Sequence, residues 1–140
     1  MKSNILLDTG LLVAIVNRRE AFHQWANQTT TNLSYSFFTC EAVITEACFL
    51  LQNVYGGADA VMGLVTSKKI VIPFQFSKEV DAIRDLMQRY QSVPMSFADA
   101  CVVRMSELIG GSSLFTIDSD FHIYRKNRKE MIDLIIPDGI

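Results

Sequence analysis

Short apolar runs alternate along the chain with longer segments whose apolar residues recur at helical spacing. We expect buried strands at 4–7, 35–38, 70–72, 114–117 and 134–136. We expect helices at 10–17, 21–28, 40–54, 58–66, 77–91 and 97–109, and a helical turn or more at 119–127. Strands that alternate with helices predict an α/β fold with a mostly parallel sheet, whose strands are continuous apolar runs because both faces are covered.

Four acidic residues interrupt or end these apolar stretches: Asp8, Glu46, Asp99 and Asp118. An unpaired buried carboxylate is costly, so it is usually paired, neutralised or bound to a metal. Parallel sheets bind ligands at the carboxyl ends of their strands, where Asp8 and Asp118 are expected. Glu46 and Asp99 fall within the first two turns of predicted helices. Four acids in such positions favour a shared cation.

Each acid except Glu46 also has a purely structural interpretation. Asp8 could cap the helix that begins near residue 10, and Asp118 could cap the turn that follows it. Asp99 could belong to a capping box opened by Ser96.

Glu46 has no capping position and falls on an apolar helix face with Val43, Ala47 and Leu50. A structural glutamate would prefer the opposite face. Glu41, in contrast, lies in the first turn of the same helix, where the helix dipole favours a carboxylate. Glu46 is therefore the strongest individual indication of a site.

The composition fits one domain spanning residues 1–140 with a substantial core, since 49% of the 140 residues are hydrophobic. The net charge of −2 gives no bulk argument for nucleic acid. Basic residues nevertheless cluster at Arg18-Arg19, Lys68-Lys69 and 125–129. Two interpretations stay open: solvated helix ends, and phosphate contacts that flank the acids.

The chain contains three cysteines and no C-x-x-C pair, which is typical of small buried thiols in a reducing compartment. No apolar run reaches the ~18 residues that a membrane span needs. The N-terminus superficially resembles a signal peptide, but Asp8 breaks its apolar region and no small-residue cleavage site follows. We predict a cytoplasmic protein with no membrane partner.

Carboxylates without a neighbouring histidine or thiolate favour a hard cation, Mg²⁺ or Mn²⁺, over zinc. Such cations assist in-line displacement at phosphorus. A receiver-like phospho-acceptor domain would also cluster acids, but it needs paired acids after its first strand. Only Asp8 stands there.

Four segments that contain the acids resemble the PIN-domain family, and within it the VapC-type toxins of bacterial toxin–antitoxin pairs. They are ILLDTGLLVAIVNRRE at 5–20, TCEAVITEACFLL at 39–51, SFADACVVRMSE at 96–107 and LFTIDSDF at 114–121. Their order and spacing fit a PIN domain over essentially the whole chain. The resemblance implies a three-layer α/β/α fold, with a mostly parallel central sheet flanked by helices, and metal-dependent cleavage of RNA.

The resemblance also implies roles for individual residues and for partners. Asp8, Glu46, Asp99 and Asp118 match the family's metal-binding catalytic acids. Thr9, Thr116 and Asp120 would be auxiliary, although Thr116 could be an ordinary strand residue and Asp120 a solvated acid. A small antitoxin protein and a homodimer are the implied partners, with RNA as substrate. The alternative is a PIN-like module that binds RNA or protein without catalysis.

Overall fold

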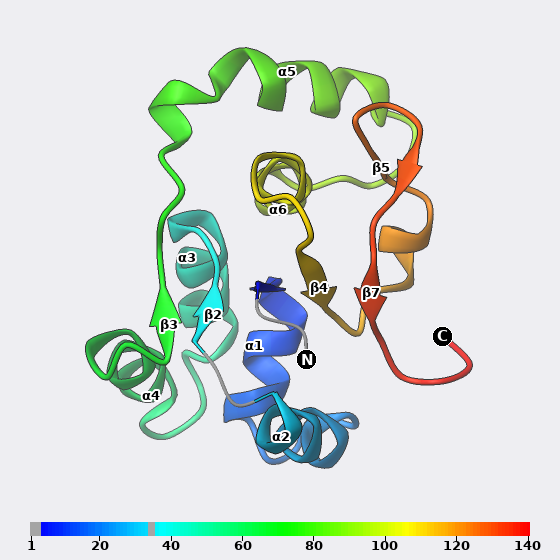
Figure 1. Ribbon diagram of the computed structural model, residues 1–140. Helices are drawn as coiled ribbons and strands as arrows, with labels where there is room; N and C mark the ends of the chain where they lie inside the picture. The colour runs from blue at the N-terminus through cyan, green and yellow to red at the C-terminus, as the bar shows by residue number, and fades with distance from the viewer. Residues whose placement is uncertain (1–3, 34–35) are drawn as a thin grey trace.

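A five-stranded parallel sheet forms the centre of the molecule (Figure 1). The computed structural model describes residues 4–33 and 36–140. The sheet consists of β1 Ile5–Leu7, β2 Phe37–Phe38, β3 Ile70–Val71, β4 Ser113–Phe115 and β7 Leu134–Ile135. Their order is β3-β2-β1-β4-β7, and each neighbouring pair is parallel. The predicted α/β fold with a mostly parallel sheet is confirmed.

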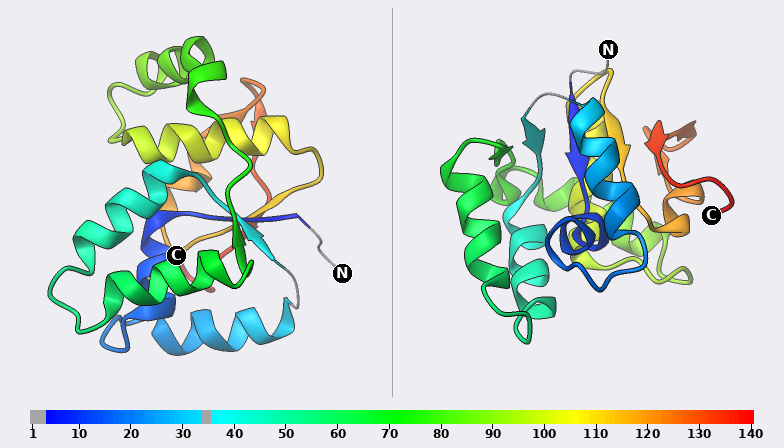
Figure 2. Two further views of the ribbon diagram at one scale, coloured as in Figure 1. Left: turned by 90° about the vertical axis from the view of Figure 1, so that its left-hand side faces the viewer. Right: turned by 90° about the horizontal axis from the view of Figure 1, so that it is seen from below.

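Helices cover both faces of this sheet. They are α1 Thr9–Val16, α2 His23–Asn32, α3 Glu41–Leu50, α4 Gly57–Thr66, α5 Val80–Arg89 and α6 Phe97–Leu108. In the left view of Figure 2, α5 and α6 lie on one side of the strands and α2 and α4 on the other, which gives three layers. In the described part of the chain, no helix is both long enough and apolar enough to cross a membrane.

The residues of the central strands are buried on both faces of the sheet. Ile5, Leu6 and Leu7 of β1 are at most 1% exposed, and Leu114 and Phe115 of β4 are fully buried. Continuous apolar runs of this kind are expected where helices cover both faces of a parallel sheet. From the α2 side, Trp25 packs edge-to-face on Phe115 with ring centroids 5.4 Å apart. This core fixes the carboxyl ends of β1 and β4 side by side.

Helix α3 is shorter than the 40–54 predicted from the sequence, because the chain turns directly after Leu50. Gly56 has a φ of 69° and precedes α4, so the glycine pair starts the next helix rather than ending α3. A Cβ on Gly57 would lie 3.0 Å from both the Cβ and the carbonyl oxygen of Leu51. This close approach favours glycine at the turn. Of the predicted strand at 35–38, Tyr35 lies outside the described residues.

The helical prediction for 119–127 is wrong beyond its first turn. A 3₁₀ turn, η2 Ser119–His122, is followed by the strand β5 Arg125–Lys126. This strand pairs antiparallel with β6 Glu130–Met131. Asn127 and Arg128 in the connecting loop have φ values of 51° and 70°, a conformation that asparagine tolerates well. A further 3₁₀ turn, η1 Phe76–Lys78, delays the start of α5 to Val80.

Candidate active site

Asp8 lies at the carboxyl end of β1 and is held rigidly there. The parallel register pairs Leu7 with Phe115, which brings Asp8 next to Thr116. One carboxylate oxygen of Asp8 accepts a hydrogen bond from the backbone N–H of Leu11 at 3.0 Å, so the predicted cap of α1 is present. The other oxygen accepts the Thr116 hydroxyl at 2.5 Å. Asp8 is only 3% exposed, so its carboxylate has almost no contact with water.

Thr116 connects two of the acids. Its hydroxyl donates to Asp8 and accepts the backbone N–H of Asp118 at 3.0 Å. Asp118 in turn accepts the backbone N–H of Asp120 at 2.9 Å, which is the predicted capping interaction for the turn that follows. Thr116 is fully buried. It therefore faces the acids and fixes their relative position, which an ordinary strand threonine would not do.

Asp99 is the third residue of α6 and forms the predicted capping box. Its N–H donates to the Ser96 hydroxyl, and its carboxylate accepts the Ser96 N–H, both at 3.0 Å. Burial, together with the nearby carboxylates of Asp118 and Glu46, raises the pKa of Asp99 to about 6 against the opposing hydrogen bonds with Ser96. Capping occupies one carboxylate oxygen, and the same side chain still interacts with the other acids.

Glu46 is half-buried on α3 and has no hydrogen bond or ion pair among the described residues. Val43 and Ala47 of the predicted apolar face are buried, whereas Leu50 is 54% exposed. The next residue, Leu51, takes the buried position because the helix ends at Leu50. Glu46 lines a groove whose other side chains are Ala42, Thr45, Phe49, Phe97 and Ala98.

The electrostatic environment of the site consists mainly of other carboxylates. Burial raises the pKa of Asp8 to about 7 against the hydrogen bonds from Thr116 and Leu11, and Asp118 and Asp99 add to this rise. The pKa of Asp99 is in turn raised by burial and by the charges of Asp118 and Glu46. The fold thus brings Asp8, Asp99 and Asp118 within electrostatic reach of one another, and Glu46 within reach of Asp99, although the four acids come from different segments.

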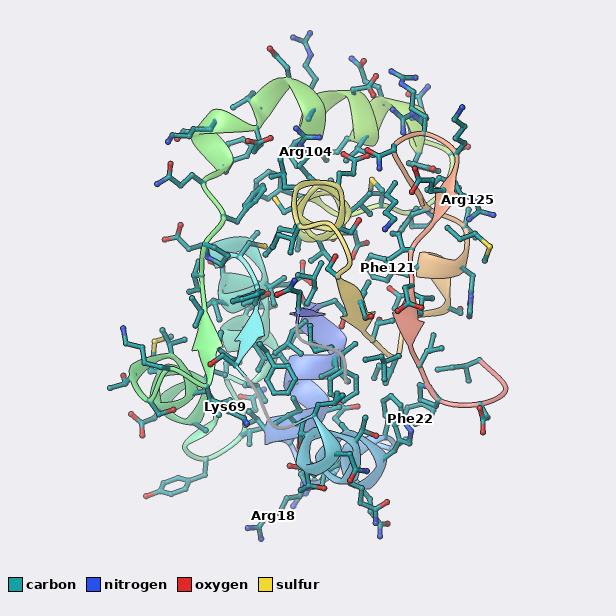
Figure 3. All side chains as sticks on the ribbon, viewed as in Figure 1. Arg18, Phe22, Lys69, Arg104, Phe121 and Arg125 are labelled. Carbon is teal, nitrogen blue, oxygen red and sulfur yellow. The ribbon has the colours of Figure 1, made fainter. Side chains whose placement is uncertain are left out.

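Arg104 does not neutralise this cluster, although it lies little more than one turn beyond Asp99. Its guanidinium is bound by Glu79 at 2.7 Å and by Glu107 at 3.0 Å. Burial opposes the charged form of Arg104, but the hydrogen bonds that Arg104 donates to Glu79 and Glu107 outweigh it and raise the pKa. Figure 3 shows Arg104 between α6 and α5. Its salt bridges therefore join elements of the scaffold.

The auxiliary residues predicted from the sequence lie around the same acids. Thr9 is buried at the first position of α1, directly after Asp8. Asp120 is half-buried in the turn after Asp118. Tyr124 is fully buried, which raises its pKa, and the charges of Asp99, Asp120 and Asp118 add to that rise. Asp120 therefore belongs to the acidic surroundings of the site.

The side chains fit a hard divalent cation by their chemistry. All four candidate donors are carboxylates, and Asp8 is buried with acids as its charged neighbours. Among the residues that the structure describes, however, no three aspartate, glutamate, histidine or cysteine side chains are close enough to form a ready-made metal cage. Bringing the carboxylates together would require side-chain adjustment, for which the unpaired Glu46 is free.

One polar residue that positions the site was missed by the sequence analysis. Thr39 follows β2 as Thr116 follows β4, and it is fully buried. Its hydroxyl donates to the carbonyl oxygen of Leu7 at 2.8 Å, immediately before Asp8. A polar residue directly after a buried strand was the available signal, and it is the same signal that identified Asp8 and Asp118.

Comparison with known proteins bears on both the sequence and the fold. The sequence model of the PIN domain matches residues 5–127. Among solved structures, the chain is similar to VapC20 of Mycobacterium tuberculosis, which is described as a sarcin–ricin loop cleaving toxin. The two share 21% sequence identity with a TM-score of 0.72, over 84% of this chain and 92% of that one. No curated protein sequence matches significantly.

Proposed function

The chain belongs to the PIN domain family, and from this premise we propose that it is a metal-dependent endoribonuclease of the VapC type. Asp8, Glu46, Asp99 and Asp118 would be its catalytic, metal-binding acids. The observation that carries the proposal is that Asp99 and Asp118 lie within electrostatic reach of the buried Asp8 carboxylate, and Glu46 within reach of Asp99, with no basic side chain bound to any of the four in the described residues. Such an arrangement is costly for folding alone.

The cation would be Mg²⁺ or Mn²⁺, bound by the four carboxylates. When bound, it supplies positive charge that lowers the pKa of an attacking water and stabilises the charge developing on the phosphodiester. The acid-only donor set is the property of this chain that supports the assignment.

The protein residues would orient the reacting groups and move the proton. Thr116 fixes Asp8 and Asp118, and Ser96 fixes Asp99. A carboxylate held beside the cation is suited to accept the proton of the attacking water. Thr9, Thr116 and Asp120 would act as auxiliary residues that complete the polar surroundings.

Cleavage of RNA tests this proposal directly. Glu46→Gln removes the charge of an acid that has no hydrogen-bond partner, so the fold should be little affected. Glu41→Gln removes an exposed acid from the first turn of the same helix and is the matched control. We expect cleavage with Mg²⁺ or Mn²⁺ that EDTA abolishes, at least a hundredfold slower for Glu46→Gln and unchanged for Glu41→Gln. Full activity of Glu46→Gln or in EDTA would contradict the proposal.

We further propose that the protein acts in the cytoplasm, as a toxin restrained by a small antitoxin protein, and that it forms a homodimer. Its three free cysteines fit a reducing compartment. Phe49 is 65% exposed, and Phe76, Val80 and Phe97 are between 39% and 45% exposed, so apolar surface suited to protein contacts adjoins Glu46. Light scattering tests the dimer. A short adjacent reading frame for a DNA-binding protein tests the antitoxin.

A second candidate is a PIN-like module that binds RNA or protein without cleaving RNA. The lack of a preformed cage of three metal-binding side chains in the described part of the chain favours it. Calorimetry separates the two functions, because the binding module would bind RNA but take up no Mn²⁺.

A further inference from the structure

We propose that the groove between the end of α1 and the α3–α4 turn is a binding subsite for single-stranded RNA, in which Arg18 and Arg19 contact phosphates and Tyr55 stacks on a base. The groove has a volume of about 760 Å³, and its polar lining includes Asn17 and Asn53. The inference rests on the proposed ribonuclease function, because it assigns part of the substrate to a place outside the acidic centre.

The two arginines are unlike most of the other arginines in the described structure, because neither guanidinium has a partner. Arg104 binds two glutamates, and Arg89 and Arg128 bind Asp85. Arg125 donates to three backbone carbonyls. Arg18 and Arg19 are exposed and form no ion pair or side-chain hydrogen bond within residues 4–33 and 36–140. Two adjacent free guanidinium groups are suited to phosphate oxygens.

Capping of α1 does not account for these arginines. Basic residues after a helix often bind its last carbonyls, but other groups do so here. Asn17 donates its N–H to Val13, the His23 ring bonds to the carbonyl oxygen of Ala14 at 2.7 Å, and the Asn27 amide donates to that of Ile15 at 3.1 Å. Three of the last four carbonyl oxygens of α1 are therefore already bonded by other groups. The Asn17 side chain also accepts the Arg19 N–H at 3.1 Å, which fixes the turn that presents both arginines.

Tyr55 supplies the aromatic surface that a base needs. Its relative exposure is 105%, and its ring has no hydrogen bond or ring contact in the described structure. The surrounding turn is nevertheless well defined, since Val54 donates to Leu51 and Gly57 donates to Val54, both at 2.9 Å. Proteins that bind single strands combine such exposed rings with a positively charged groove that follows the backbone.

The groove and two of the acids are connected by the same two helices. Helix α1 begins directly after Asp8 and ends at the arginines, and α3 carries Glu46 and ends before Tyr55. At 1.5 Å per residue, α1 spans about 12 Å, so the groove lies a few nucleotides from the acids. Helices α1 and α3 pack against each other, so one helix pair carries the groove and Glu46 and begins next to Asp8. Figure 3 shows Arg18 at the side of the molecule opposite α5.

Binding of a short fluorescent single-stranded RNA of mixed sequence, in EDTA to prevent cleavage, tests the proposal. We expect the double variant Arg18→Gln/Arg19→Gln to bind at least tenfold more weakly. The logarithm of its association constant should also fall less steeply with the logarithm of the salt concentration. The slope should be smaller by about 1.4, since each phosphate contact on a single strand contributes about 0.7. The matched control is Arg84→Gln, an exposed and unpaired arginine on α5, which should leave the affinity and slope unchanged.

Tyr55 distinguishes stacking from other contacts. Tyr55→Leu should lower the affinity about fivefold or more, while Tyr55→Phe keeps the ring and should bind as the wild type does. In cleavage assays, Tyr55→Leu should raise KM and leave kcat unchanged. The proposal is overturned if the arginine double variant binds like Arg84→Gln, or if Tyr55→Leu binds normally. It is also overturned if Tyr55→Leu changes only the mass measured by light scattering, because the groove would then be a contact between protein copies.

Failure of this inference can be told apart from failure of the proposed function. Glu46→Gln should bind the RNA as tightly as the wild type in EDTA, because Glu46 lies outside the groove. If wild-type protein binds RNA through the groove but never cleaves it, the subsite stands and the ribonuclease proposal fails. If it cleaves RNA and the groove variants change neither KM nor affinity, the ribonuclease proposal stands and the subsite fails.

Discussion

Replacing Asp8 by asparagine should stabilise the metal-free protein at alkaline pH, although Asp8 is proposed to be a catalytic acid. Asp8 is 3% exposed, and burial raises the pKa of its carboxyl group from 3.8 to about 7. In the folded protein the ionised form therefore lacks most of its hydration and faces other acids. Asparagine has nearly the same shape and carries no charge. The substitution removes an electrostatic penalty that the scaffold tolerates for function.

The size of the effect follows from the two pKa values. A pKa of about 7 in the folded state against 3.8 in the unfolded state corresponds to about 4 kcal/mol. Because the folded pKa is raised, this penalty is absent below the unfolded value, grows as the pH rises between the two, and is complete above pH 7. Asparagine has one carbonyl oxygen in place of two carboxylate oxygens. It therefore loses one of the two hydrogen bonds that Leu11 and Thr116 donate, at a cost of about 1–3 kcal/mol. A net gain of about 2 kcal/mol remains at pH 8.

Urea denaturation in EDTA measures this difference, with the fluorescence of Trp25 as the signal. Trp25 is the only tryptophan and packs on Phe115 in the core. At pH 8, Asp8→Asn should unfold with a free energy about 2 kcal/mol higher than the wild type. At pH 4, close to the ordinary pKa of 3.8 that the carboxyl group has in the unfolded chain, the penalty is nearly absent, so Asp8→Asn should be the less stable protein.

Asp59→Asn, in the exposed first turn of α4, is the control and should show no such reversal with pH. Adding Mn²⁺ at pH 8 should stabilise the wild type and leave Asp8→Asn unaffected, since a ligand stabilises only the protein that binds it. The reasoning is refuted if Asp8→Asn is less stable than the wild type by the same amount at both pH values.

Three further results are expected. Thr116→Val should lower the free energy of unfolding by about 1–3 kcal/mol in urea at pH 8, because Asp8 and the N–H of Asp118 both lose a hydrogen bond, whereas Thr116→Ser should cost less. Mn²⁺-dependent cleavage should fall as the pH drops from about 7 to about 6, because protons then compete for Asp8 and Asp99, and higher Mn²⁺ should shift this fall to lower pH. Arg104→Gln should lower stability by about 1 kcal/mol or less, as its salt bridges are partly exposed, and should leave the rate of cleavage unchanged.

The fold class could be predicted because the strand residues are buried on both faces and form continuous apolar runs. The β5–β6 hairpin could not, since Arg125, Lys126 and Glu130 carry no apolar alternation. Distant contacts stabilise it instead. The Arg125 N–H donates to the Tyr90 hydroxyl at 2.9 Å, and the Asn127 N–H donates to Glu107 at 2.7 Å. Bonds between residues so far apart leave no local pattern in the sequence.

The site shows the same division between local and long-range information. Caps at Asp8 and Asp99 are local and were recognisable, but they appeared as alternatives to a shared site. The structure contains the caps and also brings both acids near Asp118. The hydrogen bond from Thr116 to Asp8 depends on the register of β1 and β4, which strands of three residues do not specify on their own. Leu50 was predicted on the buried face of a helix that continues to residue 54, but α3 ends at Leu50 and this side chain is exposed.

Calorimetric titration with Mn²⁺ at pH 7, in two buffers of different ionisation enthalpy, tests most directly whether the acids form one cation site. The wild type should bind Mn²⁺ and release protons, because Asp8 is about half protonated at its pKa of about 7. Glu46→Gln should bind at least tenfold more weakly, while Glu41→Gln should match the wild type. Equal binding by Glu46→Gln, or no binding by the wild type, would contradict a metal centre built from these four acids.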